Sequence, residues 1–276
     1  MSEALIDHDD QHAKYAPQDD GGTEEHETQI ATDATGDYIE AGVNRAHEDG
    51  STIVPRIVMI SLHAVSVAFS TWLLVGGVTT LHASWRVHVP FRAYAMLVCL
   101  WLVWVKHAVS LKWIIKRKVQ WAEALPLALF SFPCEVGMAL LATGLDGKDR
   151  PGWPALVTAN GGDYAAVAVY AVGWIVSTWA EVDRMLWKRD PANKGKCYTG
   201  GLWRYSAHIN YFGETLMWSA IATLTAVWWT AWLPLSMAAG FVWYHIPGLD
   251  KYLSQRYGAE FDEYQRTTSH FIPFVY

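Results

Sequence analysis

The chain has 276 residues, enough for one large domain or two small ones. Its hydrophobic content of 52% and its 16 tryptophans are unusual for a soluble protein, and the formal net charge is −6. The three cysteines, Cys99, Cys134 and Cys197, form no CxxC pair, so neither a disulfide framework nor a cysteine metal site is indicated. The histidines are scattered without metal-ligand spacing, and we expect neither a metal nor a nucleic-acid partner.

The N-terminal end differs in charge from the rest of the chain. Residues 1–50 carry 14 acidic and two basic side chains, whereas the remainder carries 13 acidic and 19 basic ones. A segment with high charge and few large apolar residues cannot bury enough surface to fold. We therefore predict a disordered acidic tail at 1–52 and a membrane domain at 53–276. The tail is either a solvated extension or a segment that binds a protein partner. It lacks the features of a secretory signal or a transit peptide.

From Ile57 onward, long apolar runs alternate with charged or Gly/Pro-rich breaks. Four runs reach the ~20 residues that a membrane helix needs. They lie at roughly 57–81, 93–111, 122–145 and 163–182, with Pro126 and Pro133 as expected kinks in the third. The stretch from Tyr211 to Pro247 is too long for one span, and "WWTAWLP" in its middle predicts a hairpin of two helices. The expected fold is all-α, a polytopic transmembrane helical bundle of about six spans.

Basic side chains predict the orientation of this bundle. The connections near 112–118 and 183–205 carry ten Lys and Arg residues, against four in the opposite connections. Because Lys and Arg prefer the cytoplasmic side, we expect both termini in the cytosol. The endoplasmic reticulum or another endomembrane is the expected location.

Polar side chains gather at the start of the fifth apolar stretch, in "GLWRYSAHINYFGETLMW" at 201–218. Polar groups cost several kcal/mol in hydrocarbon when they have no partners, so a neighbouring helix or a ligand must satisfy them. For Glu214, the alternative is a carboxylate favoured by the helix dipole. A ligand docked from the cytosol explains the whole group best.

The flanking segments carry two further signals. The basic stretch "DRMLWKRDPANKGKCYTGGLWRYS" is suited to anionic lipid head groups or to a phosphorylated nucleotide. No GxGxxG follows a strand, which argues against a Rossmann domain. The last stretch, "YLSQRYGAEFDEYQRTTSHFIPFVY", predicts a short amphipathic helix with Tyr257, Phe261, Tyr264 and Thr268 on one face, followed by an aromatic tail. Packing of that face against the bundle is favoured over ligand contact.

Three motifs together resemble a known family. "GLWRYSAHINYFGE" resembles the "GLWRYSRHPNYFGE" signature of the DUF1295 group, which belongs to the superfamily of steroid 5-alpha-reductases, sterol reductases and isoprenylcysteine carboxyl methyltransferases. "KRKVQWAEALPLALF" and "RYGAEFDEYQRTTSHFIPFVY" resemble two further elements of that group. The resemblance runs from about residue 90 to the end.

The resemblance implies a membrane reductase that uses NADPH to reduce a carbon–carbon double bond of a lipophilic, sterol- or enone-like molecule. Membrane lipids and that molecule are then the expected partners, and lipid metabolism is the expected process. Carried over by position, Asn210, Tyr211 and Glu214 line the nicotinamide end, and His208 is a further cofactor-binding candidate. Asp183, Asn193, Lys194 and Arg204 approach the phosphates or the adenine, and Asp250 is a cofactor-contacting acid.

The proton donor is less well indicated. A buried Glu or Tyr can protonate an enone oxygen, which makes Tyr211 and Glu123 the catalytic candidates, although each has a structural reading as well.

Two departures from the family pattern keep other functions open. The usual Arg-His-Pro is Ala207-His208-Ile209 here, and "WYHIPGLDKY" has few basic residues. The alternatives are an S-adenosylmethionine-dependent methyltransferase of the same superfamily and a non-catalytic membrane subunit derived from it.

Overall fold

The computed structural model describes residues 39–40, 43–44, 53–81, 90–115, 119–143 and 161–275. In the N-terminal tail it describes only β1 (Ile39–Glu40) and β2 (Val43–Asn44), an antiparallel pair in which Ile39 lies opposite Asn44. The rest of the tail lies outside the described residues, so its disorder stays a prediction.

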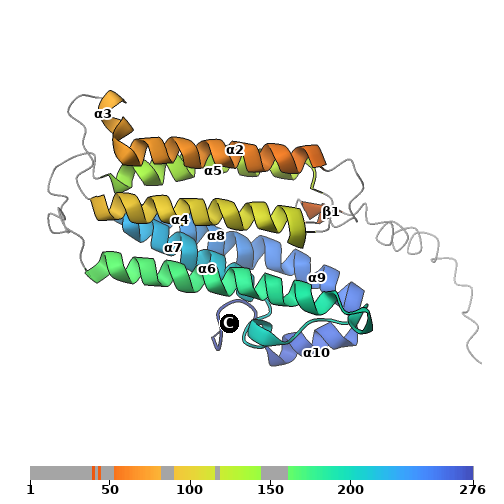
Figure 1. The fold of residues 1–276 in the computed structure, drawn as a ribbon. Helices are drawn as coiled ribbons and strands as arrows, with labels where there is room; N and C mark the ends of the chain where they lie inside the picture. Colours follow the sequence, from red (N-terminus) through yellow and green to blue (C-terminus); the bar gives the residue numbers. More distant parts are fainter. Residues whose placement is uncertain are drawn as a thin grey trace, which may run out of the picture.

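The rest of the described chain is built from helices (Figure 1). In chain order they are α2 (Ile53–Trp72), η2 (Leu73–Gly77), α3 (Val78–Leu81), α4 (Pro90–Val109), η3 (Ser110–Ile114), α5 (Trp121–Ala142), α6 (Gly161–Lys188), η4 (Pro191–Asn193), η5 (Gly201–Arg204), α7 (Ile209–Leu224), η6 (Trp228–Ala231), α8 (Trp232–Gly240), η7 (Phe241–His245), α9 (Ile246–Tyr257) and α10 (Ala259–Thr267). This is the all-α polytopic membrane bundle that the apolar runs predict.

Four helices are long and apolar enough to cross a membrane, and they correspond to the four predicted runs. They are Ile53–Gly77, Phe91–Ile114, Ala124–Ala142 and Gly161–Lys188. The third contains Pro126 and Pro133 without a break in the helix. Each run forms a helix because only a helix satisfies its backbone groups within the segment when water is absent.

The predicted hairpin also forms, with shorter helices than two full spans require. α7 has 16 residues and α8 has nine, and η6 joins them at "WWTA". α8 continues through η7 into α9 without a loop. Among the described residues, four helices are therefore long and apolar enough to cross a membrane, and the hairpin adds α7 and the unbroken helical stretch from α8 to α9, where about six spans are expected.

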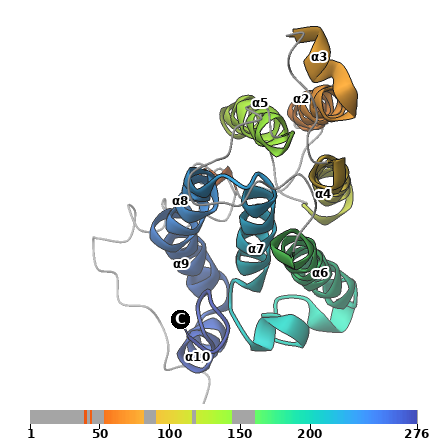
Figure 2. The ribbon, with the colours of Figure 1, turned by 90° about the vertical axis from the view of Figure 1, so that its left-hand side faces the viewer.

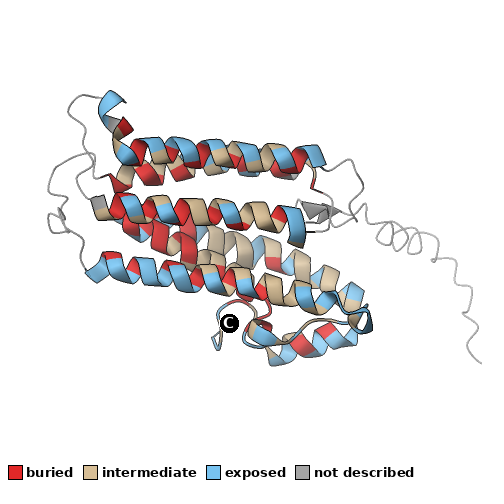
Figure 3. Ribbon diagram, in the orientation of Figure 1, coloured by how far each residue is buried: buried red, intermediate tan, exposed pale blue. Residues whose placement is uncertain are grey.

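Burial follows the pattern expected for a bundle in lipid (Figure 3). The faces between helices hold fully buried apolar side chains such as Met96, Leu100, Met217 and Ile221. Large apolar side chains such as Leu129 and Val172 are exposed on the outward faces. Lipid tails are as apolar as these side chains, so the exposed residues suit contact with hydrocarbon.

Glycines bring α6 and α7 into close contact, and Figure 2 shows the two helices side by side. A Cβ atom on Gly173 would lie 2.7 Å from the carbonyl oxygen of Gly213, and one on Gly213 would lie 2.6 Å from the backbone nitrogen of Ser177. Small residues at such contacts let membrane helices pack backbone to backbone. This contact accounts for the glycine of "NYFGE" on packing grounds.

The C-terminal segment folds as two short helices where one amphipathic helix is predicted. Gly258 separates α9 from α10 with a φ of 56°, a left-handed conformation that glycine adopts easily. Phe261 and Tyr264 are buried, in agreement with the face predicted to pack against the bundle.

Candidate functional site

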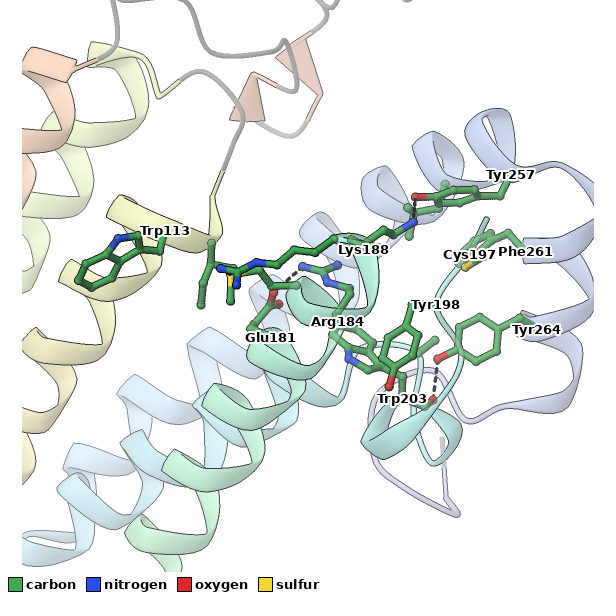
Figure 4. Close-up of a pocket in the computed structure, with 15 residues that line it drawn as sticks. Trp113, Glu181, Arg184, Lys188, Cys197, Tyr198, Trp203, Tyr257, Phe261 and Tyr264 are labelled. Carbon is green, nitrogen blue, oxygen red and sulfur yellow. Dashed lines mark hydrogen bonds and ion pairs between the residues drawn. The ribbon is translucent and has the colours of Figure 1, made fainter. Parts of the chain in front are cut away.

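A pocket of about 500 Å³ lies between the C-terminal end of α6 and helices α9 and α10 (Figure 4). Its walls come from η3, α6, the connection after α6, α9 and α10. The lining residues are Trp113, Ile114, Glu181, Arg184, Met185, Lys188, Arg189, Cys197, Tyr198, Trp203, Ala207, Leu253, Tyr257, Phe261 and Tyr264. Aromatic rings and basic side chains dominate this surface.

The connection between α6 and α7 is shaped by local hydrogen bonds. The Asp190 carboxylate accepts from the backbone N–H of Ala192 at 2.9 Å and caps η4. The Tyr198 hydroxyl donates to Asp183 at 2.6 Å. Gly201 has a φ of 54°, and a Cβ there would lie 2.1 Å from the Asp183 carboxylate. Glycine at 201 therefore lets Asp183 hold Tyr198 in the pocket wall.

Three cations and one carboxylate line the pocket. Arg184 pairs with Glu181 and lies over the Trp203 ring, 4.8 Å from its centroid. Lys188 donates to the Tyr257 hydroxyl at 3.0 Å and also to the carbonyl of Lys196. Arg189 is exposed, and its guanidinium approaches the Met185 sulfur at 3.9 Å. The excess of two positive charges favours an anionic ligand.

The remaining polar groups of the walls stay neutral at physiological pH. Burial raises the pKa of the Cys197 thiol to about 11. Burial and the hydrogen bond to Asp183 raise the pKa of Tyr198 to about 12, and burial also raises the pKa of Tyr264. A neutral thiol and neutral phenols add no negative charge, so the basic residues keep the pocket positive.

Polar contacts link the pocket residue Glu181 to α7, and α7 in turn to α4. Glu181 accepts a hydrogen bond from the Asn210 side chain at 2.8 Å while it pairs with Arg184. One turn further along α7, Glu214 pairs with Lys106 of α4, whose side chain is 7% exposed. Asn210 and Glu214 are thus satisfied by neighbouring helices, one of the two outcomes expected for this polar stretch.

His208 belongs to a second polar group at the start of α7. Its Nε2 lies 2.8 Å from an Asp250 oxygen, and the other Asp250 oxygen lies 3.6 Å from Nδ1 of His270. The His208 ring stacks on Tyr211, which in turn stacks on Phe241 with ring centroids 4.5 Å apart. Nδ1 of His208 is buried and has no hydrogen-bond partner among the described residues. Such an atom is suited to bind a ligand or a water molecule.

The segment after α10 closes the structure around this group. The backbone N–H groups of Ala207 and His208 donate to the carbonyls of Ser269 and His270, at 2.8 and 3.0 Å. The Tyr264 hydroxyl donates to the carbonyl of Trp203 at 2.6 Å. α10 and the segment 268–271 therefore hold the start of α7 in place against the pocket wall.

The structure separates the predicted site residues into groups. The lining residues named above include none of the predicted cofactor-binding residues. Asp183 and Asn210 bond to the lining residues Tyr198 and Glu181, whereas His208, Tyr211 and Asp250 form the neighbouring group.

The other predicted residues are placed apart from the pocket wall. The Asn193 amide donates to the carbonyl of Trp187 at 3.0 Å, and Lys194 and Arg204 are exposed. The side chain of Glu123 lies outside the described residues. The assigned roles of all these residues stay predictions.

The basic stretch predicted to hold phosphate supplies Arg184, Lys188 and Arg189 to the pocket. Glu181 was not singled out from the sequence, because one carboxylate at the end of an apolar run resembles a solvated helix end. Tyr257, Phe261 and Tyr264 were expected to pack, and they both pack and line the pocket.

Comparison with known proteins supports this region as a family domain. A family model described as a protein of unknown function (DUF1295) matches residues 136–268. This range begins later than the resemblance expected from about residue 90. A curated relative, the probable O-methyltransferase ustE of Ustilaginoidea virens, is 35% identical over 92 residues. The match covers 32% of this chain and 31% of the relative, so the chain spans about a third of that protein.

Proposed function

Because residues 136–268 belong to the DUF1295 family, we propose that the chain is an integral membrane enzyme that binds NADPH in the pocket beside α6 and reduces a carbon–carbon double bond of a lipophilic molecule. The positive pocket with aromatic walls is the observation that carries this proposal. NADPH combines three phosphate groups with two ring systems. Arginine suits phosphate because its guanidinium presents parallel donors, and aromatic walls suit the rings.

The residues around the pocket fit parts of such a cofactor. Arg184, Lys188 and Arg189 would hold the phosphates, and aromatic side chains such as Tyr198 and Tyr257 would contact a ring. The buried Nδ1 of His208 has no described partner and would meet the polar edge of the nicotinamide end. When bound, NADPH supplies the hydride. The protein's part is to hold the two reactants and to position a proton donor.

Tyr211 is the donor that we propose, because its ring lies stacked between those of His208 and Phe241 near the start of α7. The stacked rings hold the phenol in one orientation. A positioned hydroxyl can protonate the substrate as the hydride arrives. Glu123 remains the other candidate from the sequence.

A lipophilic substrate would arrive through the bilayer, which agrees with the apolar outer faces of the helices. The basic connection 183–205 lies on the pocket side, and we propose that this side and both termini face the cytosol of an endomembrane. The acidic tail is then available to a protein partner on the same side.

The second candidate is an S-adenosylmethionine-dependent methyltransferase, favoured by the name of the Ustilaginoidea virens relative. Aromatic rings can bind the sulfonium of that cofactor. In this pocket, however, Arg184 lies over Trp203, and Lys188 lies 4.8 Å from the centroid of Tyr257. Protein cations therefore already occupy those ring faces, and a second cation would be repelled.

Ligand-dependent stabilisation separates these functions. The full-length protein in detergent is heated with NADPH, NADH or S-adenosylmethionine, each from micromolar to millimolar concentration. A ligand at 100 times its Kd stabilises the folded state by about 2.7 kcal/mol. We expect NADPH to raise Tm most, because it carries the most negative charge.

Each of the other outcomes identifies a different function. A shift with S-adenosylmethionine alone would establish the methyltransferase in place of the reductase. No shift with any of the three would favour a non-catalytic subunit.

A further inference from the structure

A second cluster of titratable side chains lies between α2, α4 and α5, away from the pocket. His63 of α2 and Glu135 of α5 are 6% and 0% exposed, and Nε2 of His63 lies 2.5 Å from Oε1 of Glu135. The ring of His107 on α4 lies 5.2 Å from that of His63, measured between centroids. Neither the cofactor nor the donor proposed above uses these three residues.

The position of the pair argues against a purely structural role, because burying two ionisable side chains there costs free energy. Both residues lie on candidate membrane spans, His63 ten residues after the start of α2 and Glu135 near the middle of α5. Ionisable residues at such depth are expensive to insert, and a buried ion pair is weak support for stability. Apolar side chains of the same size would pack there at lower cost.

Nearby polar atoms remain unsatisfied. Oε2 of Glu135 and the hydroxyls of Ser66 and Ser70 are buried without a hydrogen-bond partner among the described residues. His63, Ser66 and Ser70 follow one face of α2, at spacings of three and four residues. A network evolved for stability would satisfy these groups. The cluster instead keeps acceptors available for a proton or a water molecule.

Three separate polar contacts lie between this cluster and the pocket. α4 lies between α2 and α6 (Figure 2), and its consecutive residues Lys106 and His107 contact different partners. His107 meets His63, and Lys106 pairs with Glu214 of α7. From α7, Asn210 bonds to the pocket residue Glu181.

The groups that surround the pair come from four helices. α4 contributes His107 and Lys106, and α5 contributes Cys134 beside Glu135. On α2, Arg56 lies two turns before His63, and its guanidinium donates to the carbonyls of Leu111 and Ile115. α7 contributes Glu214, through its pair with Lys106.

We propose that His63 and Glu135 hold one transferable proton inside the membrane part of the protein and exchange it with the pocket side through His107. At rest the pair holds the proton in the 2.5 Å contact between Nε2 of His63 and Oε1 of Glu135, and it is neutral overall. When the proton passes to His107, a neutral imidazole and a lone buried carboxylate remain. That uncompensated charge favours uptake of the next proton from water.

The destination of the proton rests on the proposed function. Reduction of a double bond consumes one hydride and one proton, and the pair would restore the proton that the donor near the pocket has given up. The proton-holding pair itself does not depend on the cofactor.

Infrared titration of the full-length protein in lipid nanodiscs tests the pair. We expect a carboxylate band that titrates with pH in the wild type and is absent from Glu135→Gln. In His63→Asn, the same band should change, because the carboxyl loses the side chain that shares its proton. Thr223→Ala removes an exposed hydroxyl of α7 that donates to the carbonyl of Ser219, outside the cluster, and should leave the band unchanged.

Two results would contradict the proposal that His63 and Glu135 hold a transferable proton. One is a spectrum of Glu135→Gln that matches the wild type at every pH, and the other is a band that His63→Asn does not move. If either single variant fails to fold, the double variant His63→Asn/Glu135→Gln removes both charges together and provides the reference spectrum.

Deuterium exchange tests the route. After transfer into D₂O, the band of the pair should shift quickly in the wild type and at least about tenfold more slowly in His107→Asn, because a positioned proton carrier contributes factors of this size or more. Equal exchange rates in the two proteins would exclude His107 as the route. NADPH binding measured on the same nanodiscs tests the proposed function separately, because exchange requires no cofactor.

Discussion

The two halves of the bundle handle their charged residues differently. In α2, α4 and α5, charges turn inward between helices: Arg56 donates to backbone carbonyls, and His63 pairs with Glu135. In α6 to α10, Arg184, Lys188 and Arg189 line an open pocket whose walls are aromatic. Charged residues thus form an enclosed network among α2, α4 and α5, whereas they line an open pocket among α6 to α10.

The difference follows from helix length. α7 has 16 residues and α6 has 28, so α6 extends past the start of α7 and exposes its last turns. The family match covers α6 to α10 and only the end of α5. If the pocket has the function proposed above, we expect the cofactor to contact the helices inside the family match and the substrate to be selected by α2, α4 and α5.

The largest expected effect concerns the ion pair that joins the two halves. Lys106→Met leaves the half-buried Glu214 without its partner, which should lower the free energy of unfolding by about 3 kcal/mol. The double variant Lys106→Met/Glu214→Leu should recover most of that loss. Denaturant titration in detergent measures both. Glu263→Gln breaks an exposed pair with Arg266 and serves as the control with little expected effect.

A second variant tests the half that carries the pocket. Arg189→Ala should weaken NADPH binding by roughly 10- to 150-fold, because a hydrogen bond to a charged group contributes about 1.5–3 kcal/mol. Arg266→Ala removes an exposed arginine of α10 that does not line the pocket, and it should bind like the wild type. Isothermal titration at two salt concentrations checks both. Equal NADPH affinities of the two variants would show that Arg189, and with it this pocket, does not bind the cofactor.

Glycine substitutions compare the packing of the two halves. Gly213→Ala places a methyl group 2.6 Å from the backbone of Ser177 and should destabilise the protein by about 1–3 kcal/mol. Gly137→Ala on α5 has open space around its new Cβ and should be neutral or slightly stabilising. Their Tm values in detergent give the comparison directly. A Gly213→Ala protein as stable as Gly137→Ala would contradict the close contact of α6 and α7.

The smallest expected effect is a pH dependence at Cys197. Its pKa of about 11 in the folded protein exceeds the ordinary value of 9.0, so the folded state holds the proton more tightly. Stability from this group is complete below pH 9 and is lost as the pH rises toward 11. Maleimide labelling of the Cys99→Ser/Cys134→Ser protein should be slow at pH 7 and should accelerate on unfolding. Equal labelling rates in the folded and unfolded states would contradict the raised pKa.

The sequence predicts the helices well because hydropathy acts locally. The four apolar runs and the turn at "WWTAWLP" each form where they are expected. The short length of α7 could not be read in the same way. It depends on where Gly213 meets Gly173, and that register is a contact between distant parts of the chain.

The sequence predicts the chemistry of the site well. It predicts less well which residues form the site. The charge of the 183–205 stretch indicates an anion-binding surface, and three of its basic residues line the pocket. Asn193 belongs to the same stretch, yet its amide bonds to the carbonyl of Trp187. Side-chain direction in a loop depends on such hydrogen bonds, and composition does not reveal them.

The late position of α10 in the chain also matters during biosynthesis. The basic end of α6 leaves the ribosome well before Phe261 and Tyr264, so in the nascent protein its cations first meet phospholipid head groups. Attraction to those anions would anchor the helix in its final orientation before the pocket has walls. Only when α10 docks would Phe261 and Tyr264 complete the walls of the pocket around these cations.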